Sequence, residues 1–134
     1  MDPHNRTRAA WLVIIVMAHA VVSAVHGVAH QHAAVTLSGA AQVFVFSVIV
    51  AGPLLGAALI QPWPHTAHWI IAATMSASFV FGCVNHFLVA GPDHVAHVSA
   101  DSRAMFGATA VLVAATEALG AWLAILAVRK GGRT

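Results

Sequence analysis

The stretch that decides the fold is residues 9–30, which read AAWLVIIVMAHAVVSAVHGVAH. Its length matches the roughly 20 apolar residues needed to cross a hydrocarbon core about 30 Å thick. Its only ionisable side chains are the imidazoles of His19, His26 and His30. At about 100° per residue, these three fall within roughly 40° of one another on a helix. We therefore expect a membrane-spanning helix with a narrow histidine stripe that needs polar partners elsewhere.

The composition of the whole chain indicates an integral membrane protein. Of its 134 residues, 60% are hydrophobic and only 7% are charged, whereas soluble domains carry about 25% charged residues. Four segments are apolar over nearly the length of a membrane span. We predict an all-α, four-helix transmembrane bundle that forms a single domain over residues 1–134. Its helices are expected at about 9–30, 40–60, 66–90 and 104–128, and Pro53 should kink the second of them.

Basic residues predict how the bundle is oriented. Five of them flank the first and last helices, namely Arg6, Arg8, Arg129, Lys130 and Arg133, whereas Arg103 alone lies in a loop at the opposite end. By the positive-inside rule, both termini are cytoplasmic. We expect a multi-pass protein of the prokaryotic inner membrane, with loops 31–39 and 91–103 outside. Lipid headgroups and topology account for the net charge of +2, so no nucleic-acid partner is expected.

Histidines and a carboxylate gather at the outward end of this predicted bundle. His26 and His86 each lie about four residues from the outer end of their helix, so both are about 6 Å deep. Neutral imidazole is the commonest metal ligand in proteins, and a pair spaced by four on a helix can point at one ion. The sequence thus predicts a metal site, in which Asp93 orients an imidazole as a hydrogen-bond acceptor. The expected ligands are His26, His30 and His86, with His94 and His97 completing or gating the site.

The sequence leaves the cofactor open. Nitrogen and oxygen donors together suit copper, zinc or iron. Haem b is the alternative, with His26 and His86 as axial ligands and with Gly27 and Gly82 leaving room for the porphyrin face.

Glu117 lies about halfway along the fourth predicted helix, where a carboxylate is costly and indicates function. His19 has a similar depth. The two residues are expected to hold or relay a proton beneath the metal site, or to form a buried hydrogen-bonded pair. Two other functions stay open. One is a small proton-coupled transporter built on Glu117 and His19, which would form a homo-oligomer because four helices enclose little space. The other is a non-catalytic subunit of a larger membrane complex. The sequence does not decide whether the protein is an enzyme.

Overall fold

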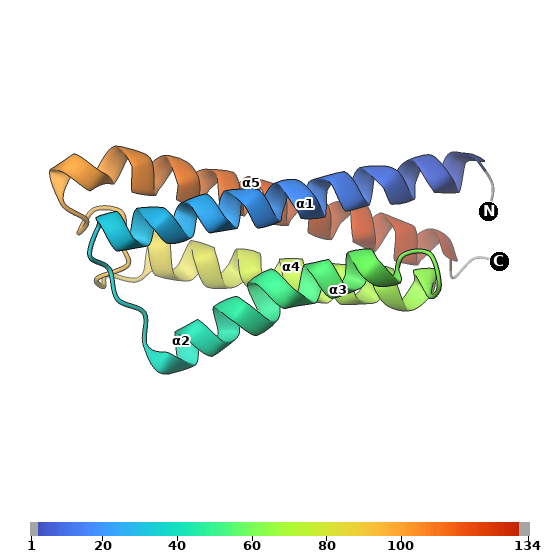
Figure 1. Cartoon of the computed structure of the whole chain (residues 1–134), viewed down its shortest axis with the longest axis horizontal. Helices are drawn as coiled ribbons and strands as arrows, with labels where there is room; N and C mark the ends of the chain where they lie inside the picture. The colour runs from blue at the N-terminus through green and yellow to red at the C-terminus, as the bar shows by residue number, and fades with distance from the viewer. Residues whose placement is uncertain (1–2, 132–134) are drawn as a thin grey trace.

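The computed structural model describes residues 3–131 and the side chains of residues 6–130, and this part is helical apart from short connections (Figure 1). Its helices provide four apolar segments long enough to cross a membrane: Arg6–His32, Gly39–Leu59, Pro64–Leu88 and Ala100–Lys130. The prediction of an all-α protein with four helical segments long and apolar enough to span a membrane is confirmed. Helices α1 (Pro3–His32) and α5 (Ala100–Gly131) extend beyond the predicted 9–30 and 104–128. The apolar stretch of a sequence predicts the part of a helix that lies in the hydrocarbon core. The polar residues on either side of that stretch can continue the same helix beyond the core.

The second span consists of α2 (Gly39–Phe44), the π-helical segment η1 (Val45–Ala51) and α3 (Gly52–Leu59). Pro53 explains the π-helical turns, because proline has no N–H for the carbonyl of residue 49 and its ring crowds that carbonyl. The backbone widens instead, and the N–H of Gly52 donates to the carbonyl of Ser47. Pro53 thus bends the span as predicted, and α2 diverges from the bundle (Figure 1).

The third span ends in a second π-helical turn. Helix α4 (Pro64–Cys83) passes directly into η2 (Val84–Leu88), which ends two residues before the predicted Ala90. The side-chain amide of Asn85 donates to the carbonyl of Phe81 at 2.8 Å. Single π-helical turns are frequent at functional sites, and here the turn contains His86, which is buried.

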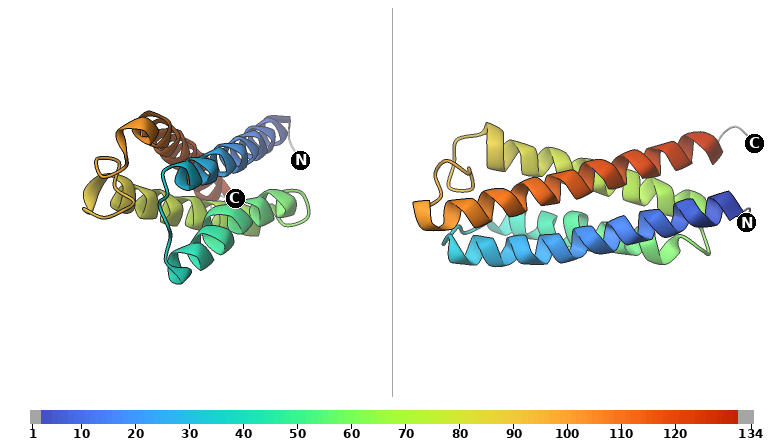
Figure 2. Two further views of the ribbon diagram at one scale, coloured as in Figure 1. Left: turned by 60° about the vertical axis from the view of Figure 1, so that its left-hand side comes forward. Right: turned by 90° about the horizontal axis from the view of Figure 1, so that it is seen from above.

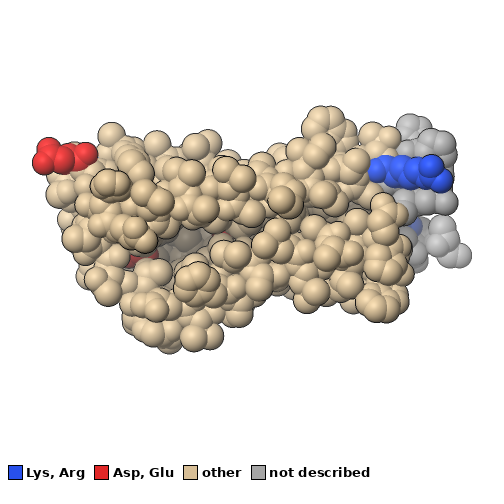
Figure 3. Space-filling model, in the orientation of Figure 1, with Lys and Arg blue, Asp and Glu red and all other residues tan. Residues whose placement is uncertain are grey.

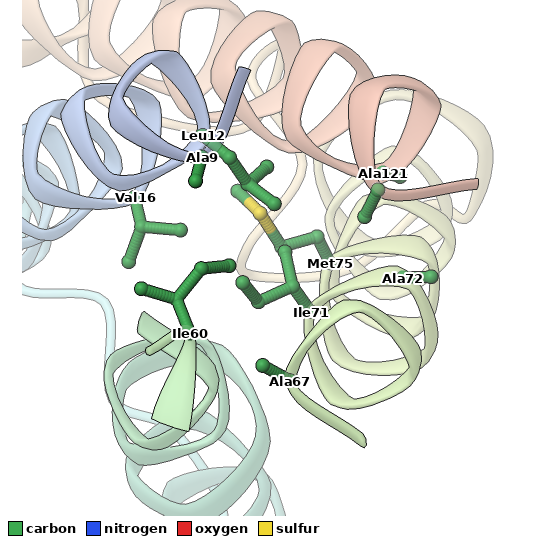
Figure 4. Packing of buried hydrophobic residues seen from close by; sticks show 10 residues of the cluster. Ala9, Leu12, Val16, Ile60, Ala67, Ile71, Ala72, Met75 and Ala121 are labelled. Carbon is green, nitrogen blue, oxygen red and sulfur yellow. The ribbon is translucent and has the colours of Figure 1, made fainter. Parts of the chain in front are cut away.

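The spans pack closely against one another where α1, α3, α4 and α5 meet. The buried core in this half of the molecule contains Leu12, Val16, Ile71 and Met75 (Figure 4). Gly56 packs so closely on α4 that an added Cβ would lie 3.2 Å from the carbonyl oxygen of Ala67. Such close approach is the usual basis of helix packing in lipid, which offers no hydrophobic driving force between helices.

The two ends of the bundle differ in charge. Helix α1 begins and α5 ends at the same end (Figures 1 and 2), so Arg6, Arg8, Arg129 and Lys130 lie together there, and basic side chains are visible at that end in Figure 3. Arg133 lies outside the described residues. Arg103 is at the opposite end, where it donates to the carbonyl of Val98 at 3.1 Å. That the basic end faces the cytoplasm stays a prediction.

Candidate metal centre

Three of the predicted ligands meet at the end of the bundle opposite the termini. His26 and His30 lie one turn apart near the end of α1, and His86 reaches them from η2. One nitrogen from each ring lies within 4.8 Å of the others, and His26 and His86 are buried. This group of donor atoms could hold a metal ion.

The ring of His26 is oriented by Thr109 of α5. The two groups are joined by a 2.8 Å hydrogen bond between Nδ1 and the threonine hydroxyl. That hydroxyl also lies 2.8 Å from the carbonyl oxygen of Met105 and 3.0 Å from that of Phe106, to which it donates. The hydroxyl oxygen therefore accepts from His26 Nδ1–H, and a neutral ring then carries its lone pair on Nε2.

The ring of His86 is oriented in the same way by the loop that follows η2. Its Nδ1 lies 3.1 Å from the backbone carbonyl oxygen of Asp93, which can only accept, so Nδ1–H donates and Nε2 carries the lone pair. The Nε2 atoms of His26 and His86 face each other at 3.2 Å. With both tautomers set by their neighbours, two lone pairs point into one space, and a cation between them removes their repulsion.

His30 and the Asp93 carboxylate complete the cluster. Asp93 Oδ1 lies 3.4 Å from His30 Nε2 and 3.3 Å from His86 Nδ1. These are ion-pair distances without hydrogen-bond geometry, and Oδ1 is a buried atom with no hydrogen-bond partner among the described residues. Nδ1 of His30 is likewise buried and unpartnered in this part of the chain. Two buried polar atoms of the cluster thus lack a hydrogen bond within the described residues.

Phe106 of α5 forms an apolar wall for the cluster. Its side chain is fully buried, and its ring centroid lies 5.1 Å from that of His26, 4.9 Å from that of His30 and 5.4 Å from that of His86. Phe106 and Thr109 were not predicted from the sequence. The available signal was helical spacing, because Phe106, Thr109, Val113 and Glu117 follow one another at intervals of three, four and four residues along α5.

His94 and His97 were predicted to complete or gate the site, but the structure places them outside the group of donor atoms. Both lie in the loop between η2 and α5. The ring of His94 bonds the carbonyl of Phe87 at 3.2 Å, and the ring of His97 bonds the carbonyl of Gly91 at 2.8 Å. Their imidazoles hydrogen-bond the loop backbone, and the group of donor atoms that could hold an ion consists of His26, His30 and His86. That His94 and His97 gate the site stays a prediction.

The predicted hydrogen bond between His19 and Glu117 does not form. His19 Nε2–H donates to the carbonyl of Ile49 at 3.1 Å, and its Nδ1 lies 3.2 Å from the hydroxyl of Thr116. Ile49 is the residue whose carbonyl Pro53 leaves without a helical donor. His19 therefore donates a hydrogen bond to the carbonyl that lost its α-helical donor at the kink of the second span.

Glu117 is buried, with 1% of its surface exposed, and neither carboxylate oxygen has a hydrogen-bond partner among the described residues. A Cβ added to Gly82 would lie 3.8 Å from Glu117 Oε2 and 3.9 Å from His86 Cδ2. The carboxylate thus lies directly beneath the histidine cluster, across the bare backbone of Gly82. Gly27, by contrast, is exposed and has no neighbour within 4 Å of an added Cβ, so it does not face the cluster.

Known proteins add nothing to this geometry: no protein-family model, curated protein or solved structure matches the chain.

Proposed function

We propose that this membrane protein binds one transition-metal ion through His26, His30 and His86. The facing Nε2 atoms of His26 and His86 carry the proposal. Their separation of 3.2 Å is close to the roughly 3.3 Å between two nitrogens bound tetrahedrally at about 2.0–2.1 Å from zinc. Metal-binding histidines also donate their second N–H to a carboxylate, carbonyl or hydroxyl, as both of these rings do.

The Asp93 carboxylate in this proposal orients the imidazoles as an acceptor, because it lies outside the group of donor atoms and beside Nδ1 of His86. Its Oδ1 is buried beside two of the rings and lacks a hydrogen bond within the described chain. Three imidazoles suit zinc, copper(II) or iron(II), and they leave a fourth position for water or another ligand. Zinc is favoured, since it is most often four-coordinate with such ligands.

Haem b is the less favoured cofactor. Axial histidines need a porphyrin plane between them, whereas the ring centroids of His26 and His86 are 4.9 Å apart and that of His30 is 4.7 Å from His26. Phe106 closes the remaining side. A single ion needs no such plane between the rings.

Elemental analysis and a visible spectrum of the purified protein test the proposal. The full chain, stripped with a chelator and reloaded with Zn²⁺, Cu²⁺ or Fe²⁺, is expected to bind one ion per chain. The double variant His26→Ala/His86→Ala should lose that ion. The matched control His94→Ala/His97→Ala removes two imidazoles at the same end and should retain it. Equal loss in both variants contradicts the proposed ligands, and a Soret band contradicts a bare ion.

A second candidate function is proton-coupled transport, which the buried, unpartnered carboxylate of Glu117 favours. An intramembrane carboxylate without a partner is costly and is typically kept for ion or proton movement. Metal flux into proteoliposomes that responds to a pH gradient is expected to disappear in Glu117→Gln. The control Asp101→Asn removes an exposed carboxylate and should leave the flux unchanged. A subunit role in a larger complex would instead leave the wild type without flux and would show a co-purifying partner.

A further inference from the structure

A separate cavity lies at the opposite, basic end of the bundle, between α1 and α5. Its volume is about 450 Å³, and the two helices diverge toward this end in the view from above (Figure 2, right). Most of the wall is apolar, formed by side chains that include Trp11, Ile15, Leu119 and Leu123. The cavity shares no residue with the histidine cluster, so its function is independent of the proposed metal site.

Two cations line the cavity where the helices leave the apolar region. They are Arg8 of α1 and Lys130 of α5, both exposed. Neither takes part in an ion pair with an acidic side chain of the described residues, whose acids lie at the other end or at mid-span. The two positive charges are therefore not neutralised by an acidic side chain of the described residues, and they can attract an anion from outside the chain.

The depth of the cavity matches one leaflet of a bilayer. Leu119 is about three helical turns from Lys130, which corresponds to about 16 Å along α5. Half of a hydrocarbon core about 30 Å thick is about 15 Å. A ligand that fills the cavity thus has an anionic group at the membrane surface and an apolar chain that reaches the bilayer midplane.

We propose that this cavity binds one anionic phospholipid, with its phosphate between Arg8 and Lys130 and one acyl chain along Leu119 and Leu123. Charge and shape both support this occupant, because basic side chains at the membrane surface attract anionic lipids. His68 of α4 also lines the cavity. It lies about one turn, or about 6 Å, inside the start of its helix, a depth suited to a hydrogen bond with the lipid's ester carbonyl.

Native mass spectrometry of the full chain, released from mild detergent, tests the lipid site. Dioleoyl phosphatidylglycerol is expected to bind at one molecule per chain. Phosphatidylcholine with the same chains tests the need for net negative charge, and glycerol 3-phosphate tests the need for acyl chains. Both should bind at least about tenfold more weakly, since each basic residue near the surface contributes several-fold to anionic-lipid binding. Equal binding of either probe overturns the proposal.

Charge-matched variants separate a built site from general attraction. Arg8→Gln/Lys130→Gln is expected to weaken phosphatidylglycerol binding about tenfold or more. Arg6→Gln/Arg129→Gln removes the same charge from residues outside the cavity wall and should weaken binding far less. Equal weakening in the two variants overturns the proposal.

A second pair of variants tests the acyl-chain wall without any change of charge. Leu119→Trp fills the deep part of the cavity and should reduce phosphatidylglycerol binding. Leu112→Trp enlarges an exposed residue on the same face of α5, two turns nearer the loops and outside the cavity, and should bind the lipid as the wild type does. Unchanged binding in Leu119→Trp overturns the placement of the chain.

Discussion

At the scale of single residues, the proposed metal centre depends on hydrogen bonds that select one imidazole tautomer. Thr109 and the Asp93 backbone each occupy a δ nitrogen, so the ε nitrogens of His26 and His86 are left to bind an ion. Groups that orient a ligand in this way typically change metal affinity by 10- to 100-fold, although they do not touch the ion. Their contribution can be measured without removing an imidazole.

Thr109→Val is expected to weaken metal binding by about 10- to 100-fold. Valine keeps the shape of threonine but cannot accept the His26 Nδ1–H bond, so the ring loses its preferred tautomer and orientation. Competitive titration with a chromophoric chelator gives the affinity. Thr116→Val is the control on the same helix, because its hydroxyl contacts His19 and not the cluster; a similar drop in that variant would contradict the assigned role of Thr109.

His19 belongs to the same histidine stripe as His26 and His30, but its hydrogen bond is to the backbone and has a structural role. It donates to the Ile49 carbonyl that Pro53 leaves free. We expect His19→Phe to destabilise the protein by about 1–3 kcal/mol, because the Ile49 carbonyl loses the hydrogen bond from His19. In a Pro53→Ala background, the helix regains an N–H for that carbonyl, and the cost should be smaller.

Unfolding of the four proteins of this double-mutant cycle in detergent, followed by circular dichroism, measures the coupling between His19 and Pro53. Metal content should remain at one ion per chain in His19→Phe, since His19 lies outside the ligand group. Additive effects of the two substitutions would refute the link between the histidine and the proline kink.

At the scale of elements, packing depends on glycines that admit the neighbouring helix. Gly56 on α3 contacts Ile71 and lies close to the backbone of α4, whereas Gly27 on α1 faces open space. Backbone atoms cannot move away from an added methyl group as a flexible side chain can. The same substitution should therefore have opposite consequences at the two positions.

Gly56→Ala is expected to destabilise the bundle by about 1–3 kcal/mol through overpacking against Ile71 and the Ala67 carbonyl. Gly27→Ala should be neutral or slightly stabilising, because alanine is the better helix former and nothing obstructs its methyl group. Thermal unfolding in one detergent compares the two. Equal unfolding midpoints for the two variants would show that α3 and α4 do not pack as closely as in the structure.

At the scale of the whole molecule, the outer surface fits a bilayer rather than water. Large hydrophobic side chains are exposed along every span, and a soluble protein does not leave so much apolar surface uncovered. Three of the exposed tryptophans, Trp11, Trp63 and Trp69, lie within about two turns of the basic end, where the aromatic rings that mark a membrane interface are expected. The histidine cluster then lies near the other face.

Cysteine labelling in intact bacterial cells tests this orientation, in a Cys83→Ser background that removes the native thiol. Thr36→Cys, in the loop next to the histidine cluster, is expected to react with a membrane-impermeant maleimide. Gln61→Cys, in the turn at the basic end, should react only after permeabilisation, because the positive-inside rule places that end in the cytoplasm. The reverse pattern would show that the metal centre opens to the cytoplasm.

The four spans could be predicted from sequence because hydropathy acts locally: about 20 apolar residues must lie in lipid whatever their neighbours are. The grouping of His26, His30 and His86 could also be predicted from sequence, because helical spacing and depth place the three residues at one level. Their partners could not be predicted, because Thr109 and Phe106 reach the cluster only through the way α5 packs on α1. Tertiary structure likewise separated His19 from Glu117 and placed His94 and His97 outside the group of donor atoms. A hydrogen bond depends on distance and direction within a few tenths of an ångström, and these are decided only when kinks, π-helical turns and loops are in place.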